Sequence, residues 1–171
     1  HNFAVDSVRK LLDQEIRARM RVNTARYETM LTLLEGLIEK YENNVISSAE
    51  IIKQLLEIAD EIKKLDQESK DTGLSEEEIV FYDTLEKNPD LKNAGIDIKE
   101  FVKELTKRIR RDLAIDWTNN ETIKARIRQN VRLLLLQKGI VEEMQTKRLI
   151  ESIYLETVRV YREYLPAYHH A

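Results

Sequence analysis

The segment AIDWTNNETIKARIRQNVRLLLL, residues 114–136, joins a polar start to a long apolar run. Its apolar residues recur every three or four positions, which is the spacing of one face of an α-helix; they are Ile123, Ile127, Val131 and Leu134. Further leucines extend the apolar surface around the far end of the run. The segment therefore predicts a helix over residues 119–137 whose far end is covered on several sides.

The polar residues before this helix have two interpretations. Thr118 and Glu121 form a capping-box pattern, in which a hydroxyl and a carboxylate satisfy the free backbone amides of a helix start. Asp116 can accept a hydrogen bond from another helix end, and Trp117 suits a buried linker between helices. The alternative is an enzyme active site or a nucleotide-binding site centred on Asp116, Trp117, Glu121 and Arg126. We favour the structural roles, because acid–base chemistry needs a second titratable group and histidine occurs only at His1, His169 and His170.

The rest of the chain also has a helical composition. Its 171 residues include only 4 Gly and 2 Pro, and residues with high helix propensity dominate. Ser47–Glu50 and Ser75–Glu78 have the capping-box form, and Asp97 suits the residue that caps a helix start. We predict an all-α fold of about six helices in an irregular bundle, with one long N-terminal helix and a kink near Asn23. The predicted helices are 6–41, 48–70, 76–87, 98–112, 119–137 and 142–165.

Length and composition limit the class of protein. A chain of this size forms one domain with a real core but cannot hold a nuclease and a nucleotide-driven motor together. The absence of cysteine excludes disulfides and thiolate metal sites. Because histidine occurs only at the two ends of the chain, we also expect no imidazole-based metal site. Because no run approaches 18 apolar residues, we expect no membrane span, no export segment and a cytoplasmic location.

Charge is distributed unevenly along the chain. Residues 39–91 carry 15 acids and 6 bases, a net charge of −9, whereas residues 103–132 carry 9 bases and 4 acids, a net charge of +5. Bases form rows along the two helices of this basic region: Lys103, Lys107 and Arg110, then Lys124, Arg128 and Arg132. Such rows are either solvated helix faces or a surface that contacts double-stranded DNA phosphates weakly and without sequence preference.

Tyrosine is concentrated at the end of the chain. Four of the seven tyrosines lie in the last 18 residues: Tyr154, Tyr161, Tyr164 and Tyr168. Tyrosine is common in protein interfaces because it buries a large area while keeping a polar tip. The alternatives are ordinary packing of the last helix and a partner-contact surface that includes Tyr154, Tyr161 and Tyr164.

Three stretches in this order resemble a known family: YENNVISSAEIIKQLLEIADEIKK at 41–64, GLSEEEIVFYDTL at 73–85 and IDWTNNETIKARIRQNVRLLLLQKG at 115–139. The family is the helical C-terminal domain of the restriction (endonuclease and motor) subunit of type I restriction-modification enzymes. The resemblance implies a single helical domain over residues 1–171, excised from a larger subunit. Its parts are a long helix at 1–41, a family-like core at 42–140 and a terminal helix at 141–171.

The resemblance also implies a function. The parent subunit uses ATP and Mg²⁺ in preceding domains to translocate and cleave DNA, and this region docks it onto a methyltransferase core of modification and specificity subunits. We therefore expect a non-catalytic assembly module that holds no cofactor or metal and adds sequence-independent DNA backbone contact. The alternative is a freestanding helical enzyme or nucleotide-binding domain centred on the DWTNNE segment. The four glycines are isolated and form no GxxxxGK[ST] phosphate loop, which favours the assembly module.

Overall fold

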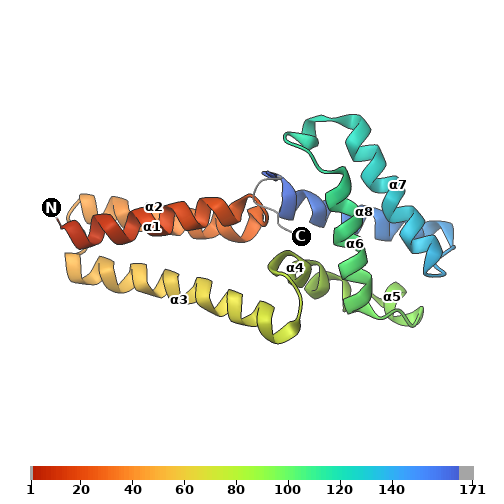
Figure 1. Ribbon diagram of the computed structural model, residues 1–171, viewed down its shortest axis with the longest axis horizontal. Coiled ribbons are helices and arrows are strands. Elements are labelled where there is room, and N and C mark those ends of the chain that lie inside the picture. The colour runs from red at the N-terminus through yellow and green to blue at the C-terminus, as the bar shows by residue number, and fades with distance from the viewer. Residues whose placement is uncertain (1, 166–171) are drawn as a thin grey trace.

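The computed structural model describes residues 2–165, and every regular element in this range is helical (Figure 1). The elements are α1 (Phe3–Met20), α2 (Thr24–Glu42), α3 (Ser48–Thr72), α4 (Glu76–Leu85), α5 (Pro89–Asn93), α6 (Ile98–Asp112), the 3-10 turn η1 (Trp117–Asn119), α7 (Glu121–Gln137) and α8 (Glu143–Tyr161). The predicted all-α class is confirmed, with eight α-helices in the described part of the chain instead of about six. None of these helices is both long and apolar enough to cross a membrane.

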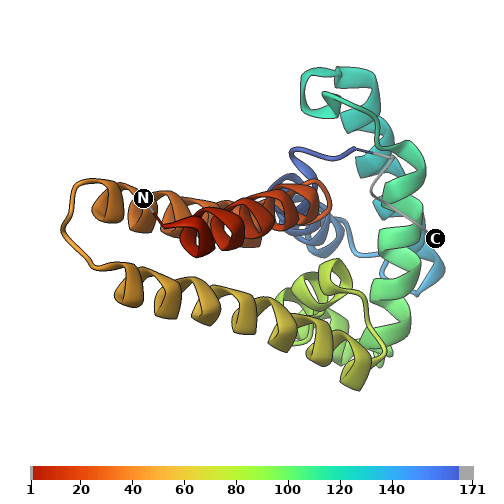
Figure 2. The same cartoon turned by 60° about the vertical axis from the view of Figure 1, so that its left-hand side comes forward.

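Helices α1, α2 and α3 form an elongated arm on one side of the molecule (Figures 1 and 2). Their apolar stripes meet in a cluster of buried side chains that is separate from the rest of the core; it contains Val5, Leu12, Ile16, Met20, Tyr27, Leu34, Leu37, Ile51, Leu55, Ile58 and Ile62. In α3 the apolar residues Ile51, Leu55 and Ile58 recur at helical spacing and lie in this core. Helix α3 is capped by Ser47, whose hydroxyl accepts a hydrogen bond from the Glu50 amide.

The single long helix predicted at 6–41 is wrong. The chain leaves the helix at Arg21 and starts α2 at Thr24, with Asn23 at φ −150° between them. The two helices then run antiparallel, as the ion pairs Arg9–Glu42 and Arg17–Glu35 show. The physical reason is that both halves carry an apolar stripe. A straight helix would expose both stripes to water, whereas folding back buries them against each other and against α3.

Helices α4 to α8 form the body of the molecule around a second buried cluster. Helix α6 packs against α4 and α7, and α8 packs against α7 and α4. The capping box predicted at Ser75 is confirmed, because the Ser75 amide donates to Glu78 and the Glu78 amide donates to Ser75. Asp97 caps α6, whose bounds match the prediction. The short α5 was missed because five residues are too few to show a helical period.

Coverage of the far end of α7 is less complete than predicted. Leu134 and Leu135 are fully buried, but Leu133 and Leu136 remain 42% and 44% exposed. Helix α8 ends at Tyr161, four residues before the predicted end at 165.

The arm is attached to the body by polar contacts as well as by packing. The Tyr27 hydroxyl of α2 donates to the Glu76 carboxylate at the start of α4, over 2.7 Å. The backbone amide of Glu163 donates to the Thr24 hydroxyl at the start of α2, over 3.1 Å. Arg162 makes an ion pair with Glu28 on the exposed side of the same contact. These bonds fix the first turns of α2 against the start of α4 and the end of α8.

Candidate interaction surfaces

The segment before α7 forms a tight turn in which Trp117 points into the body. Trp117 is fully buried, as expected for a structural residue, and its indole Nε1 donates to the backbone oxygen of Tyr161 over 2.8 Å. The ring of Tyr154 meets the indole edge-on at 6.4 Å. Asp116 holds a left-handed backbone conformation, φ 57°, that lets the chain turn before the indole. Trp117 therefore joins the α6–α7 connection to the last helix.

The capping box predicted at Thr118 and Glu121 is wrong. The residue that caps α7 is Asn120, whose side-chain oxygen accepts a hydrogen bond from the Ile123 amide over 3.1 Å. Thr118 lies within η1, the 3-10 turn that contains Trp117 and ends just before Asn120. It is therefore two residues too early to cap α7. Glu121 is the first residue of α7 and pairs with Lys124 over 3.1 Å.

The same geometry bears on the alternative active site. Asp116, Glu121 and Arg126 are exposed on the surface, whereas Trp117 is enclosed in the core. The indole is therefore closed to a ligand that would contact the other three side chains from solvent.

The predicted tyrosine surface requires correction. Tyr154, Tyr161 and Tyr164 are 8%, 0% and 7% exposed and belong to the core of the body. They are buried because α8 packs against both α7 and α4, which leaves no open side for them. Burial raises the pKa of the Tyr161 hydroxyl well above its usual value. Tyr168 lies outside the described residues.

Four of the six bases predicted to contact DNA are held in ion pairs. Arg110 pairs with the carboxylate of Glu77, which is only 6% exposed. The other three pairs are Lys124–Glu121, Arg128–Glu151 and Arg132–Glu143. The guanidinium of Arg128 also lies 3.7 Å from the centre of the Tyr154 ring, a cation–π contact. The pairs of Arg128 and Arg132 join α7 to α8, that of Arg110 joins α6 to α4, and that of Lys124 lies within α7.

Lys103 and Lys107 differ from the other four. Both are exposed on α6, and neither makes an ion pair with residues 2–165. They are therefore the two members of the predicted rows that pair with no carboxylate of residues 2–165, and DNA contact by either row stays a prediction.

A partly buried polar cluster at the base of the arm was not found from the sequence. Arg19 donates to both oxygens of Asp66, over 2.8 and 2.9 Å, and to the Tyr27 hydroxyl over 3.2 Å. The Arg19 guanidinium lowers the pKa of Asp66, whereas burial raises the pKa of Glu76. Burial also raises the pKa of Tyr27. These residues are far apart in sequence, so no local pattern could have indicated the cluster.

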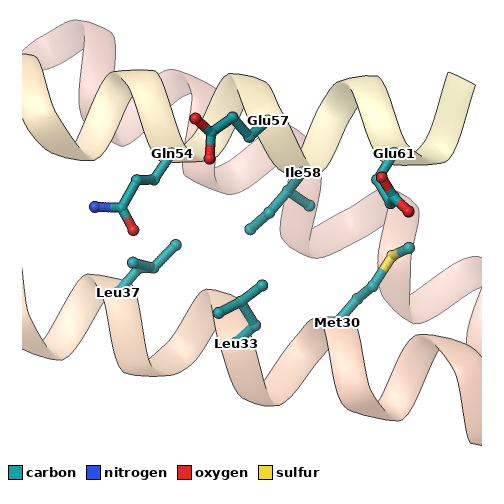
Figure 3. A pocket seen from close by; sticks show the side chains of 7 residues that line it. All are labelled: Met30, Leu33, Leu37, Gln54, Glu57, Ile58 and Glu61. Atoms are coloured by element: carbon teal, nitrogen blue, oxygen red, sulfur yellow. The ribbon is translucent and has the colours of Figure 1, made fainter.

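An apolar groove between α2 and α3 was also missed. Figure 3 shows Met30, Leu33 and Leu37 of α2 pointing toward Ile58 of α3 across an open space. The groove has a volume of about 310 Å³, and its α3 edge carries Gln54, Glu57 and Glu61. The sequence does contain one indication of it. Residues 30–38 have apolar side chains at 30, 31, 33, 34, 37 and 38, more than one core-facing stripe accounts for.

The chain matches a known protein family over most of its length. The family model described as "Type I restriction enzyme HindI endonuclease subunit-like, C-terminal" matches residues 1–156. The chain belongs to this family. The resemblance inferred from the three sequence stretches is thereby confirmed.

Two curated relatives agree with the family match. The putative type I restriction enzyme MjaIXP endonuclease subunit of Methanocaldococcus jannaschii is 31% identical over 165 residues, covering 94% of this chain and 16% of the relative. The type I restriction enzyme HindI endonuclease subunit of Haemophilus influenzae is 28% identical over 136 residues, covering 78% of this chain and 13% of the relative. The chain thus spans only a small part of the length of these relatives. No solved structure matches it.

Proposed function

We propose that this domain is a non-catalytic assembly module, which docks the restriction subunit of a type I restriction enzyme onto its methyltransferase core. The core consists of modification and specificity subunits. The observation that carries the proposal is the apolar groove that the arm leaves uncovered, in a chain whose relatives are named as subunits of a larger enzyme. Concave apolar surface that the chain does not cover is typical of a site for a partner.

The proposal assigns the chemistry to other parts of the parent subunit. ATP hydrolysis, Mg²⁺ binding and DNA cleavage take place outside this domain, and the domain binds no cofactor of its own. In support, Trp117 and the tyrosines of α8 belong to the core. Arg19 joins two helices of the arm through Asp66, and Tyr27 joins the arm to the body through Glu76.

The direct test compares two forms of the full restriction subunit, one complete and one truncated before this domain. Each is mixed with the cognate methyltransferase, and the assembled complex is measured by size-exclusion chromatography with light scattering. We expect the complete subunit to assemble and the truncated subunit to remain separate while it keeps DNA-stimulated ATP hydrolysis. Equal assembly of both forms would refute the docking function.

DNA contact is a second and weaker function, favoured by the two unpaired ammonium groups of Lys103 and Lys107. With only two phosphates neutralised, the slope of log affinity against log salt should change by about 1.8 when both are reversed, since each phosphate contributes about 0.9. We expect Lys103→Glu with Lys107→Glu to weaken DNA binding of the domain in gel-shift titrations. Lys63→Glu with Lys64→Glu on the exposed face of α3 is the matched control. Equal salt slopes for the two pairs would leave α6 as an ordinary solvated face. Arg110 is excluded from the test because its ion pair with Glu77 supports the fold.

A further inference from the structure

The α2–α3 groove has an apolar floor that is open to solvent. Leu37 and Ile58 are buried at its base, but Leu33 is 53% exposed at its centre. Single exposed leucines are common on protein surfaces, whereas several apolar side chains converging on a concave surface are not. Figure 3 shows this convergence from two antiparallel walls, with the apolar ends of Met30, Leu33 and Ile58 facing the space between the helices. The floor therefore suits the apolar stripe of a third, added helix.

The α3 edge of the groove is acidic and lacks counter-charges. Glu57 and Glu61 line it, and neither makes an ion pair with the residues that the structure describes. They are four residues apart on one helix, where two like charges repel each other. Cations placed along this edge would remove that repulsion. The charge pattern thus favours a partner that carries lysine or arginine beside its apolar stripe.

One residue of α2 near the groove has no side chain. Gly36 lies in the middle of α2, where glycine weakens a helix relative to alanine. A β-carbon at Gly36 would meet nothing within 4 Å, so packing inside this chain does not require glycine there. Gly36 does not line the groove, but it follows Leu33 by about one helical turn and has no side chain that would obstruct an added helix there.

From these three observations we infer that the groove binds a basic amphipathic helix of the methyltransferase core. The helix would place apolar residues at spacings of three, four and seven on Met30, Leu33 and Ile58, with lysine or arginine next to Glu57 and Glu61. The inference rests on the proposed docking function, for which it names the contact and the chemistry of the partner.

Photo-cross-linking in the intact enzyme identifies the occupant of the groove. The photoreactive residue p-benzoylphenylalanine replaces Leu33 in the full restriction subunit, the enzyme is assembled and irradiated, and the cross-linked peptides are sequenced by mass spectrometry. We expect cross-links to a lysine- or arginine-flanked amphipathic segment of a methyltransferase subunit. The matched control carries the probe at Leu56, which is 52% exposed on α3 and outside the groove. Cross-links from position 33 to another part of the restriction subunit or to a second copy would overturn the inference. So would methyltransferase cross-links no more frequent than those from position 56.

Substitutions measure how much the groove contributes to assembly. Leu33→Lys places a charge on the apolar floor and should weaken association of the full subunit with the methyltransferase about tenfold or more, as at the centre of other interfaces. Leu56→Lys, its matched control, should leave association unchanged. Both positions are exposed, so both variants should melt at the temperature of the parent. Equal affinity of the two variants would overturn the inference.

Charge reversal tests the chemistry of the partner. Glu57→Lys with Glu61→Lys should weaken association most at low salt and flatten its salt dependence, because the reversed edge repels a basic helix. Asp60→Lys with Asp71→Lys makes the same charge change at two exposed acids of α3 that do not line the groove. An identical salt dependence for the two pairs would overturn the basic character of the partner.

The truncated subunit separates a failure of the docking function from a failure of the groove assignment. If removal of the whole domain leaves assembly intact, the docking function fails. If removal abolishes assembly but the groove variants assemble like the parent, docking uses another surface and only the groove assignment fails.

Discussion

Replacing Trp117 by alanine tests the structural role of the turn before α7. Trp117 is the largest fully buried side chain of the protein and belongs to the core of the body. A buried aromatic residue removes roughly 150–250 Å² from water, which corresponds to about 4–6 kcal/mol as an upper bound. Measured losses for large aromatic residues replaced by alanine are about 3–5 kcal/mol, because alanine leaves a cavity. We expect a loss near 4 kcal/mol for Trp117→Ala.

Trp117→Phe separates the hydrogen bond from the packing. Phenylalanine keeps an aromatic ring but loses the indole donor to the Tyr161 oxygen. That oxygen retains a second donor, the Tyr164 amide at 3.0 Å, so it is not left unpaired. The lost hydrogen bond should therefore cost about 1 kcal/mol, and the smaller ring adds a packing loss of similar size. We expect about 2 kcal/mol for Trp117→Phe, between the parent and Trp117→Ala.

Urea unfolding followed by far-ultraviolet circular dichroism measures both losses, since the only tryptophan is removed as a fluorescent probe. The core of the body is separate from that of the arm, so the body should unfold first in Trp117→Ala and the arm should follow in a second phase. Two variants that unfold within about 0.5 kcal/mol of the parent, the size of an ordinary surface change, would refute a structural role for Trp117.

Three further predictions concern single contacts. Asn120→Ala should cost about 1 kcal/mol in urea unfolding and Thr118→Ala less than half of that, because Asn120 holds the cap; the reverse order would restore the capping box. Arg110→Met should cost roughly 3 kcal/mol by leaving the Glu77 carboxylate buried without its counter-charge. Adding Glu77→Met should recover part of that loss; no recovery would show that the buried charge does not cause the loss. Burial raises the pKa of Glu76 in the folded state above the ordinary value of 4.5, so its ionisation opposes folding as pH rises through the interval between the two values. Glu76→Gln should accordingly be more stable than the parent at pH 7 and lose this advantage below pH ~4.5, whereas an advantage that is the same at both pH values would exclude ionisation as its origin.

The sequence predicted those parts of the fold that depend on neighbouring residues. The capping residues Ser47, Ser75 and Asp97 mark helix starts because their side chains bond amides only three residues away. The break at Asn23 depends instead on whether two apolar stripes gain more by facing each other than one helix gains by continuing. That balance also depends on packing against α3, which is distant in sequence. The residues around Asn23 alone therefore cannot show that the chain reverses direction there.

Predictions about surfaces failed for a related reason. Helical spacing shows which residues share a face, but not whether another helix covers that face. Arg128 and Arg132 form a regular row on α7, yet both pair with carboxylates of α8, Glu151 and Glu143. Tyr154 and Tyr161 have the composition of an interface, yet α8 uses them for the core. In both cases a pattern typical of a partner surface is satisfied by a helix of the same chain.

The groove on the arm is the opposite case, because a surface that looks like core is left without a covering helix. Exposed leucines alone do not establish this, since α7 also exposes Leu133 and Leu136. What distinguishes α2 is that its exposed Leu33 stands in a hollow with buried neighbours and faces the acidic edge at Glu57 and Glu61. An apolar residue on a convex helix surface loses little by contacting water, and a partner gains little by covering it. An apolar hollow beside unpaired carboxylates offers a partner both burial and counter-charge. This difference in shape and charge makes the arm, rather than the exposed leucines of the body, the surface expected to carry assembly.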